Sequence, residues 1–253
     1  MRILVLGGTL EARQLCEQLA QRSDLTVTLS LAGRTAAPLA VPVEVRSGGF
    51  GGAAGLAAYL GAARIDLLID ATHPYAAIIS ASAAQAAERA RVRLLALRRP
   101  PWQRHPGDRW IEVADLNEAV AALGDAPRRV FLALGRKDLT PFEAAPQHHY
   151  LIRSVDPVTP PLALPQADYL TARGPFREAD ERALLEANRI EVIVAKNSGG
   201  DSTYGKIAAA RALGLDVIMP CRPPLPDVPS VARVEEVLAL LDHHADSVAT
   251  RGV

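Results

Sequence analysis

The 253-residue sequence has few of the features that mark secreted, metal-binding or membrane proteins. Its two cysteines, Cys16 and Cys221, are too few and too far apart for a disulfide scaffold or a zinc site, and we expect both to be buried thiols. No stretch is long and apolar enough to span a bilayer, and Met1–Gly7 lacks the long apolar run of a signal peptide. These absences predict a cytoplasmic protein that binds no metal.

The sequence also lacks net charge, because 28 basic residues balance 28 acidic ones. No overall field then favours nucleic acid or a membrane surface as a partner. Only three of the basic residues are lysines, namely Lys137, Lys196 and Lys206. With 49% hydrophobic and 22% charged residues, the composition is that of a globular protein, and 253 residues suffice for one large domain or two small ones.

Short apolar runs alternate with helical stretches along the chain. Arg2–Leu6 (RILVL) predicts a buried strand, and Leu10–Gln21 predicts an amphipathic helix. Further strands are predicted at Thr26–Ser30, Val43–Arg46, Leu67–Asp70 and Arg93–Leu97. Strands that alternate with helices over short connections indicate parallel sheets covered on both faces.

A proline-rich segment interrupts this alternation. Arg98–Asp108 (RRPPWQRHPGD) contains three prolines and a glycine, and the alternation resumes after it. We therefore predict an α/β protein with two Rossmann-like lobes and mainly parallel sheets. The boundaries would be residues 1–97 for the first lobe, 98–108 for the linker and 109–253 for the second lobe. Ligands of such sheets bind beyond the carboxyl ends of the strands, so we expect an active-site cleft between the lobes.

The first strand ends in Gly7, Gly8, Thr9 and Leu10. Glycines allow a sharp turn and a close approach of the backbone to a ligand, and the following helix would offer free N–H groups to a phosphate. The full glycine fingerprint of dinucleotide sites is missing, and such turns also occur without any ligand. We nevertheless assign these four residues to a cofactor phosphate site.

The second strand indicates which cofactor would bind. Ser30 occupies the position that meets the adenosine ribose in dinucleotide sites, and Gly33, Arg34 and Thr35 follow it. No carboxylate occurs in residues 26–40, whereas a hydroxyl and a guanidinium suit a 2′-phosphate. The segment therefore predicts NADPH rather than NADH, although Arg34 could also be an ordinary solvated arginine.

The fourth strand leads into Asp70–Ala76 (DATHPYA). Thr72 is a suitable cap for the following helix, and Pro74 suits its first turn. His73 could donate a proton or simply orient a ligand by a hydrogen bond. We assign Thr72, His73 and Pro74 to the cofactor site, and His73 also to catalysis.

The lysines fall in the second lobe, after predicted strands. Lys137 follows Arg129–Leu134, and Lys196 follows Glu191–Ala195 in a loop rich in glycine and hydroxyl groups. Backbone N–H groups and lysines in such a loop could bind an anion, and Arg153 and Arg173 also follow strands here. The residues assigned to substrate binding are Arg136, Lys137, Lys196, Asn197, Ser198, Thr203 and Lys206. These features predict a reductase that acts on an acidic small molecule.

Several of these segments resemble the precorrin-6A and cobalt-precorrin-6A reductase family. They are Gly7-Gly8-Thr9, Ala32-Gly33-Arg34, Asp70–Ala76 (DATHPYA), Arg99–Trp102 (RPPW), Gly135-Arg136-Lys137 and Lys196–Gly200 (KNSGG) with Lys206. DATHPYA and KNSGG are specific, whereas the GGT turn alone is not. The resemblance extends from Met1 to about Arg222, which is nearly the whole chain.

The resemblance implies that the protein uses NADPH to reduce a double bond of the precorrin-6A macrocycle, giving precorrin-6B, in cobalamin biosynthesis. Such a tetrapyrrole carries many carboxylates, which the basic residues would bind. His73, Tyr75 and Lys137 are the candidates for the proton donor. Whether the substrate carries cobalt stays open, and the product could be handed to the next enzyme of the pathway.

Two other kinds of enzyme and one binding protein compete with this interpretation. A short-chain dehydrogenase would need Tyr-x-x-x-Lys, and none of the five tyrosines has a lysine four residues later. A two-lobed transferase could use Lys196 and its loop to bind a nucleotide sugar. A two-lobed periplasmic binding protein would need the missing signal peptide.

Overall fold

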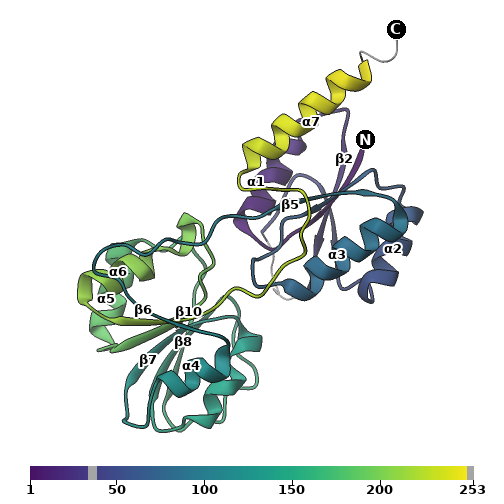
Figure 1. Ribbon diagram of the computed structural model, residues 1–253. Coiled ribbons are helices and arrows are strands. Elements are labelled where there is room, and N and C mark those ends of the chain that lie inside the picture. The colour runs from purple at the N-terminus through teal and green to yellow at the C-terminus, as the bar shows by residue number, and fades with distance from the viewer. Residues whose placement is uncertain (34–38, 250–253) are drawn as a thin grey trace. The chain divides into compact units, whose positions relative to one another are not determined.

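The computed structural model describes residues 1–33 and 39–249, with side chains up to residue 243. The chain forms two compact units (Figure 1). Unit 1 comprises Met1–Pro100 and the described residues from Pro223 onward, and unit 2 comprises Pro101–Arg222. The cleft expected between the lobes stays a prediction. Arg34 and Thr35 lie outside the described residues.

Unit 1 is built on a six-stranded parallel sheet with the order β12-β5-β4-β1-β2-β3. Its strands are β1 (Arg2–Leu6), β2 (Thr26–Leu31), β3 (Glu44–Ser47), β4 (Leu67–Asp70), β5 (Arg93–Leu97) and β12 (Ser230–Val231). The central strands are apolar because helices cover both faces of the sheet. The order reverses beside β1, which is where ligands bind in sheets of this kind.

Four helices cover this sheet in pairs. They are α1 (Leu10–Leu19), α2 (Gly52–Ala62), α3 (Ala77–Ala90) and α7 (Val234–Ala249). Leu15 of α1 and Val237 of α7 are buried in one cluster, whereas Leu56 and Leu60 of α2 and Ala83 of α3 are buried in the other. Figure 1 shows α1 with α7 on one face and α2 with α3 on the other.

Unit 2 repeats this architecture with a parallel sheet of order β6-β11-β10-β7-β8-β9. Its strands are β6 (Arg109–Val113), β7 (Arg129–Ala133), β8 (His149–Ser154), β9 (Ala167–Thr171), β10 (Val192–Ala195) and β11 (Asp216–Pro220). Its helices are α4 (Leu116–Ala122), α5 (Glu178–Ala187) and α6 (Gly205–Leu213), with 3₁₀ turns η1 (Arg136–Asp138), η2 (Thr140–Ala144) and η3 (Asp201–Thr203). The α/β class, the two lobes and the parallel sheets are thus confirmed.

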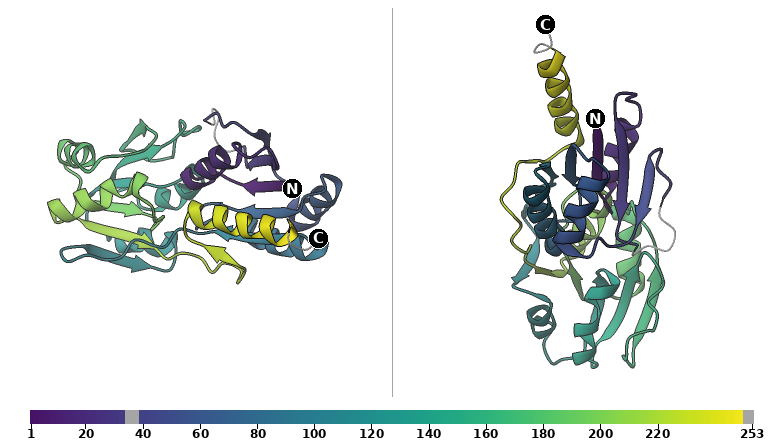
Figure 2. Two further views of the ribbon diagram at one scale, coloured as in Figure 1. Left: turned by 90° about the horizontal axis from the view of Figure 1, so that it is seen from above. Right: turned by 90° about the vertical axis from the view of Figure 1, so that its right-hand side faces the viewer.

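The C-terminal segment corrects the predicted domain boundary. The sequence assigned all of residues 109–253 to the second lobe, whereas the described residues from Pro223 onward belong to unit 1. The reason is packing: β12 pairs with β5, and Val237 and Leu241 of α7 are buried against the α1 face of the sheet. Both views in Figure 2 show the yellow helix α7 with the unit that holds the N-terminus.

The two cysteines differ from each other. Cys16 lies in the core of unit 1, and burial raises the pKa of its thiol to about 12, so it is not ionised at neutral pH. Cys221 is exposed, and its prediction as a buried thiol is wrong. It follows the last residue of β11, where the apolar strand has ended and the chain leaves the core.

Candidate functional site

The turn between β1 and α1 needs both of its glycines. A Cβ at Gly7 would lie 2.5 Å from Cδ1 of Leu29 and 3.4 Å from Cβ of Ala12, so the helix packs closely against the sheet at this point. Gly8 has a φ of +119°, which residues with a side chain rarely adopt. The glycines therefore bring the first turn of α1 directly to the end of β1.

Thr9 fixes this turn through its hydroxyl group. The oxygen accepts the N–H of Ala12 at 3.1 Å, which makes Thr9 the N-cap of α1, and the hydroxyl donates to the Ala71 carbonyl at 2.8 Å. The N–H groups of Leu10 and Glu11 have no carbonyl within the helix to bond. Backbone N–H groups at this end of α1 are thus available to a phosphate.

Glu11 places a carboxylate in the same first turn, where it would repel a phosphate. The guanidinium of Arg99 neutralises it, with Nη1 2.6 Å from Oε2 in a largely buried pair. Arg99 belongs to the RPPW segment that follows β5. This ion pair keeps the end of α1 free of net negative charge.

Ser30 lies beside the glycine turn. Its carbonyl accepts the N–H of Gly7 at 2.9 Å, and its buried hydroxyl accepts a hydrogen bond from Nη1 of Arg46 at 3.0 Å. Gly33, two residues after β2, is exposed and has a φ of +67°. The structure thus brings the turn after β1 and the end of β2 together.

Thr72 does not cap the helix after β4, so that prediction is wrong. Its N–H and hydroxyl both donate to Oδ1 of the buried Asp70, at 3.2 and 2.6 Å. α3 begins only at Ala77, with Ala76 as its N-cap, because the Ala76 N–H first closes a turn onto the His73 carbonyl at 2.7 Å. Pro74 is buried within that turn rather than in the helix.

His73 is oriented by its own turn. The backbone N–H of Tyr75 donates to Nδ1 of His73 at 3.3 Å, and the two rings lie 5.7 Å apart. An Nδ1 that accepts a hydrogen bond leaves the imidazole proton on Nε2. The half-buried imidazole of His73 is thus oriented near the carboxyl end of β4.

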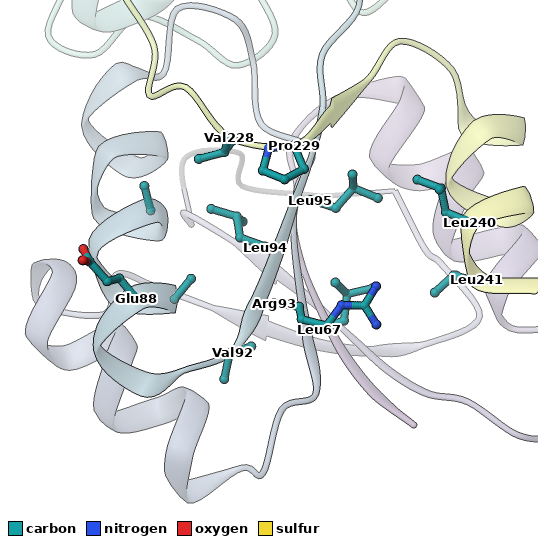
Figure 3. Close-up of a pocket in the computed structure, with 12 residues that line it drawn as sticks. Leu67, Glu88, Val92, Arg93, Leu94, Leu95, Val228, Pro229, Leu240 and Leu241 are labelled. Atoms are coloured by element: carbon teal, nitrogen blue, oxygen red, sulfur yellow. The ribbon is translucent and has the colours of Figure 1, made fainter. Parts of the chain in front are cut away.

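These segments of unit 1 meet at one edge of the sheet, since Gly7 contacts Ser30 and Thr9 contacts Ala71. A cavity of about 420 Å³ in the same unit lies elsewhere (Figure 3). Leu67 and Arg93, the first residues of β4 and β5, line it together with Leu240 of α7. None of the predicted site residues lines that mostly apolar cavity, so it is separate from the predicted cofactor site.

Unit 2 brings the loops after β7 and β10 together. Nζ of Lys196 lies 2.7 Å from Oδ2 of Asp138, and both side chains are about a quarter exposed or less. Arg136 donates to the Pro157 carbonyl at 3.3 Å, and Lys137 is exposed. The sequence did identify the cations of these loops, but it did not identify Asp138 as a partner of Lys196.

Asn197 holds its loop to the RPPW segment. Its Oδ1 accepts the N–H of Trp102 at 2.7 Å, and its Nδ2 donates to the carbonyl of the same residue at 3.1 Å. The indole N–H of Trp102 donates to the Gly200 carbonyl at 2.8 Å. The amide of Asn197 thus pairs with backbone groups, and its predicted contact with substrate stays a prediction.

The remaining substrate-binding candidates form the interior of this loop. Ser198 is buried and its hydroxyl lies 3.1 Å from that of Thr203. Lys206 is only 4% exposed, donates to the Thr203 carbonyl at 2.6 Å and lies 5.0 Å from the centre of the Trp102 ring. The contact of Lys206 with a substrate stays a prediction.

The pairing of Asn197 with Trp102 leads to a stability prediction. Asn197→Ala should lower the free energy of unfolding by about 2 kcal/mol, because it leaves two partly buried backbone groups without partners. Urea unfolding measures the change. The control is Asn117→Ala on the exposed side of α4, which should change the value by less than about 0.5 kcal/mol. Equal effects of both variants would show that the pairing of Asn197 with the Trp102 backbone does not stabilise the fold.

Two further properties concern ligands and membranes. Within residues 1–33 and 39–249, no group of three or more His, Cys, Asp and Glu side chains is arranged to hold a metal ion. None of the described helices combines the length and the apolar character needed to cross a bilayer. The cytoplasmic location stays a prediction.

Sequence reasoning missed two residues of unit 1 that support the predicted site. Asp70 orients Thr72, and Arg46 contacts Ser30. The position of Asp70 at the end of a predicted strand was a usable signal, because that edge of a parallel sheet is where ligands bind. Arg46 likewise ends a predicted strand, but its contact with Ser30 depends on how β3 pairs with β2, which the sequence does not show.

Comparisons with known proteins identify the family. Residues 2–242 match the family described as precorrin-6x reductase CbiJ/CobK. Precorrin-6A reductase of a Sinorhizobium species is 59% identical, over 96% of this chain and 93% of its own. Precorrin-6A reductase of Rhodobacter capsulatus is 49% identical over 100% and 99%, and cobalt-precorrin-6A reductase of Salmonella typhimurium is 30% identical over 87% of each chain.

A solved structure has the same fold over nearly its full length. It is that of CobK precorrin-6A reductase, which superposes with a TM-score of 0.92 at 49% identity and covers 96% of both chains. The family match and the relatives thus agree with the fold and with the motifs read from the sequence. The chain belongs to the precorrin-6x reductase family and is an oxidoreductase.

Proposed function

We propose that this protein uses NADPH to reduce a double bond of the precorrin-6A macrocycle, giving precorrin-6B, in cobalamin biosynthesis. The observation that carries the proposal is the 59% identity to a precorrin-6A reductase over 96% of the chain. The residues of the two units support it, because the capped turn after β1 would suit a dinucleotide phosphate and the cations of unit 2 would suit carboxylates. No observation favours the nucleotide-sugar transferase.

The residues of unit 1 fit a dinucleotide phosphate. Gly7 and Gly8 keep the turn after β1 free of side chains, and the capped α1 directs the N–H groups of Leu10 and Glu11 outward. Arg99 removes the charge of Glu11, which would otherwise oppose a pyrophosphate. Ser30, Gly33, Arg34 and Thr35 would lie along the adenosine ribose and its 2′-phosphate.

NADPH supplies a hydride when it is bound, and the protein positions the reacting groups. Thr72 and His73 lie at the end of β4, on the side of β1 away from Ser30. The proton on Nε2 of His73 can be donated in a hydrogen bond to a group at this edge. The proton that completes the reduction would come from His73, Tyr75, Lys137 or solvent.

The cations of unit 2 would bind the carboxylates of the substrate. Lys196 is a compact point charge, and Arg136 offers a planar fork of donors. Both would also stabilise negative charge that develops on the macrocycle during hydride transfer. We infer that the substrate is the cobalt-free macrocycle. The relatives described as precorrin-6A reductases are 44–59% identical to this chain, whereas those described as cobalt-precorrin-6A reductases are 27–30% identical. A handover of the product to the next enzyme stays a prediction.

The test is a hydride-transfer assay with the purified protein. Precorrin-6A should be reduced at the expense of one equivalent of NADPH, and the substrate absorption spectrum should shift at the same rate. NADH and cobalt-precorrin-6A should each support much slower turnover. The preference for NADPH follows from the missing carboxylate after β2, and the preference for the metal-free ring follows from the identities.

Other outcomes of this assay would reject parts of the proposal. Failure to consume NADPH with either macrocycle would remove the reductase assignment. Faster turnover of the cobalt-containing ring would reject only the cobalt-free substrate. Binding of nucleotide sugars in place of NADPH would favour the transferase instead.

A further inference from the structure

Arg46 lies at the carboxyl end of β3, next to the predicted ribose site. In the parallel pairing of β2 with β3, Arg46 is in register with Ser30, so their side chains share one face of the sheet. Nη1 donates to Oγ of Ser30 at 3.0 Å and to the Gly48 carbonyl at 3.0 Å, and Nη2 donates to the Gly49 carbonyl at 3.3 Å. The guanidinium is thus held in a fixed place.

Aromatic rings hold the same group from the side. The carbon at the centre of the guanidinium lies 3.8 Å from the centre of the Phe50 ring and 5.3 Å from that of Tyr59. The side chain is half-buried. A guanidinium fixed by a ring and by three hydrogen bonds would lose little further entropy on binding a ligand.

The positive charge of Arg46 has only neutral partners among the described residues. Arg99 and Arg153 differ, because carboxylates of Glu11 and Glu181 neutralise them. A half-buried charge is costly unless an opposite charge accompanies it. The end of β3 therefore favours an anion.

Donors remain available for that anion. A guanidinium has five N–H groups, and the described contacts use three, which leaves one on Nη2 and the one on Nε. Ser30 accepts from Arg46 but has no acceptor for its own hydroxyl proton among the described residues. Two guanidinium N–H groups and one hydroxyl match the acceptor oxygens of a phosphate monoester.

We propose that Arg46 binds the 2′-phosphate of NADPH and, with Ser30, determines the preference for NADPH over NADH. The inference rests on the proposed cofactor, because it places the adenosine ribose at the end of β2. Arg46 is the described cation at the carboxyl ends of β2 and β3, and the loop of residues 48–52 that follows contains no charge. A rigid arginine without a carboxylate partner favours a cofactor that carries the 2′-phosphate over one that lacks it.

The competing role of Arg46 is purely structural. Its bonds to the Gly48 and Gly49 carbonyls would then serve only to shape the loop before α2. A structural role predicts equal losses for ligands with and without a 2′-phosphate. A role in phosphate binding predicts a loss confined to ligands that carry it.

Calorimetric titration of the full-length protein with 2′,5′-ADP and with 5′-ADP separates these roles. Arg46→Gln should weaken 2′,5′-ADP by ~10- to 100-fold, the loss of a charged hydrogen bond, and 5′-ADP by less than ~3-fold. Arg46→Lys keeps the charge but not the planar fork of donors, so its affinity for 2′,5′-ADP should lie between those of the unaltered protein and Arg46→Gln. The control is Arg2→Gln at the exposed start of β1, which should change neither affinity.

Each outcome decides one question. Equal losses for both nucleotides, or unchanged preference for 2′,5′-ADP, would overturn the role of Arg46 while leaving the cofactor assignment intact. If the unaltered protein binds neither nucleotide, the proposed NADPH site itself fails. If Arg46→Gln does not fold, Arg46→Lys provides the same comparison of the two nucleotides.

Discussion

Glu181→Ala should lower the free energy of unfolding by about 3–5 kcal/mol, because it leaves a buried arginine without its partner. Arg153 on β8 is 6% exposed and Glu181 on α5 is 3% exposed, and they form a two-bond ion pair in which Nη2 lies 2.8 Å from Oε2. The rings of Phe131 and Phe176 flank the guanidinium at 4.9 and 3.7 Å.

Urea unfolding followed by tryptophan fluorescence measures this loss. Glu178→Ala is the matched control, because Glu178 is exposed in the first turn of the same helix. It should change the free energy of unfolding by less than about 0.5 kcal/mol. The double variant Arg153→Met with Glu181→Leu should recover most of the stability, since it removes both charges together. A loss below about 1 kcal/mol for Glu181→Ala would show that the pair is solvated.

The same pair shows why the position of a cation in a sequence does not settle its role. Arg153 follows a predicted strand at the edge where ligands bind, and the sequence therefore grouped it with the substrate cations. Its partner Glu181 is 28 residues away on a helix, and only the packing of α5 brings the two together. Arg153 is buried and its charge is paired with Glu181, so it supports the unit from within.

The fold followed from the sequence where local patterns were strong. RILVL at β1 and EVIVA before Lys196 are continuous apolar runs, which a sheet covered on both faces requires. The prediction that the C-terminal segment belongs to the second lobe was wrong, because β12 contains only Ser230 and Val231 and shows no periodic pattern in the sequence. The pairing of β12 with β5 depends on tertiary packing, which the sequence does not show.

The candidate site was predictable in position but not in its contacts. The ends of β1, β2 and β4 meet because carboxyl ends of parallel strands share one edge, and this placed Thr9, Ser30 and His73 correctly with respect to the sheet. The contact of Asn197 with Trp102 joins residues 95 positions apart, and only the fold shows it. The sequence therefore placed these residues at the sheet edge, but it did not identify their contacts.

Lys196→Met should lower kcat/KM for precorrin-6A by ~100-fold or more, and leave the Kd of NADPH within ~3-fold. The side chain of Lys196 is only 20% exposed, with Nζ 2.7 Å from Oδ2 of Asp138, and a charge in such a partly buried place interacts more strongly with a carboxylate than it would in open water. Asp138→Asn is the informative partner variant, because it keeps the shape of the side chain and the charge of the lysine. Asp138→Asn should lower kcat/KM for precorrin-6A by less than ~10-fold, since the lysine can still bind the substrate.

A double-mutant cycle separates substrate binding from a bridge between the loops after β7 and β10. If Lys196 only ties these loops together through Asp138, the two single variants should lose equal activity and the double variant should lose no more than either. If Lys196 binds the substrate, the two single variants should differ, with Lys196→Met losing ~100-fold or more and Asp138→Asn less than ~10-fold, and the double variant should be as impaired as Lys196→Met. Collapse of NADPH binding in Lys196→Met would contradict the assignment of cofactor and substrate to different units, because Lys196 lies in unit 2 and the glycine turn lies in unit 1.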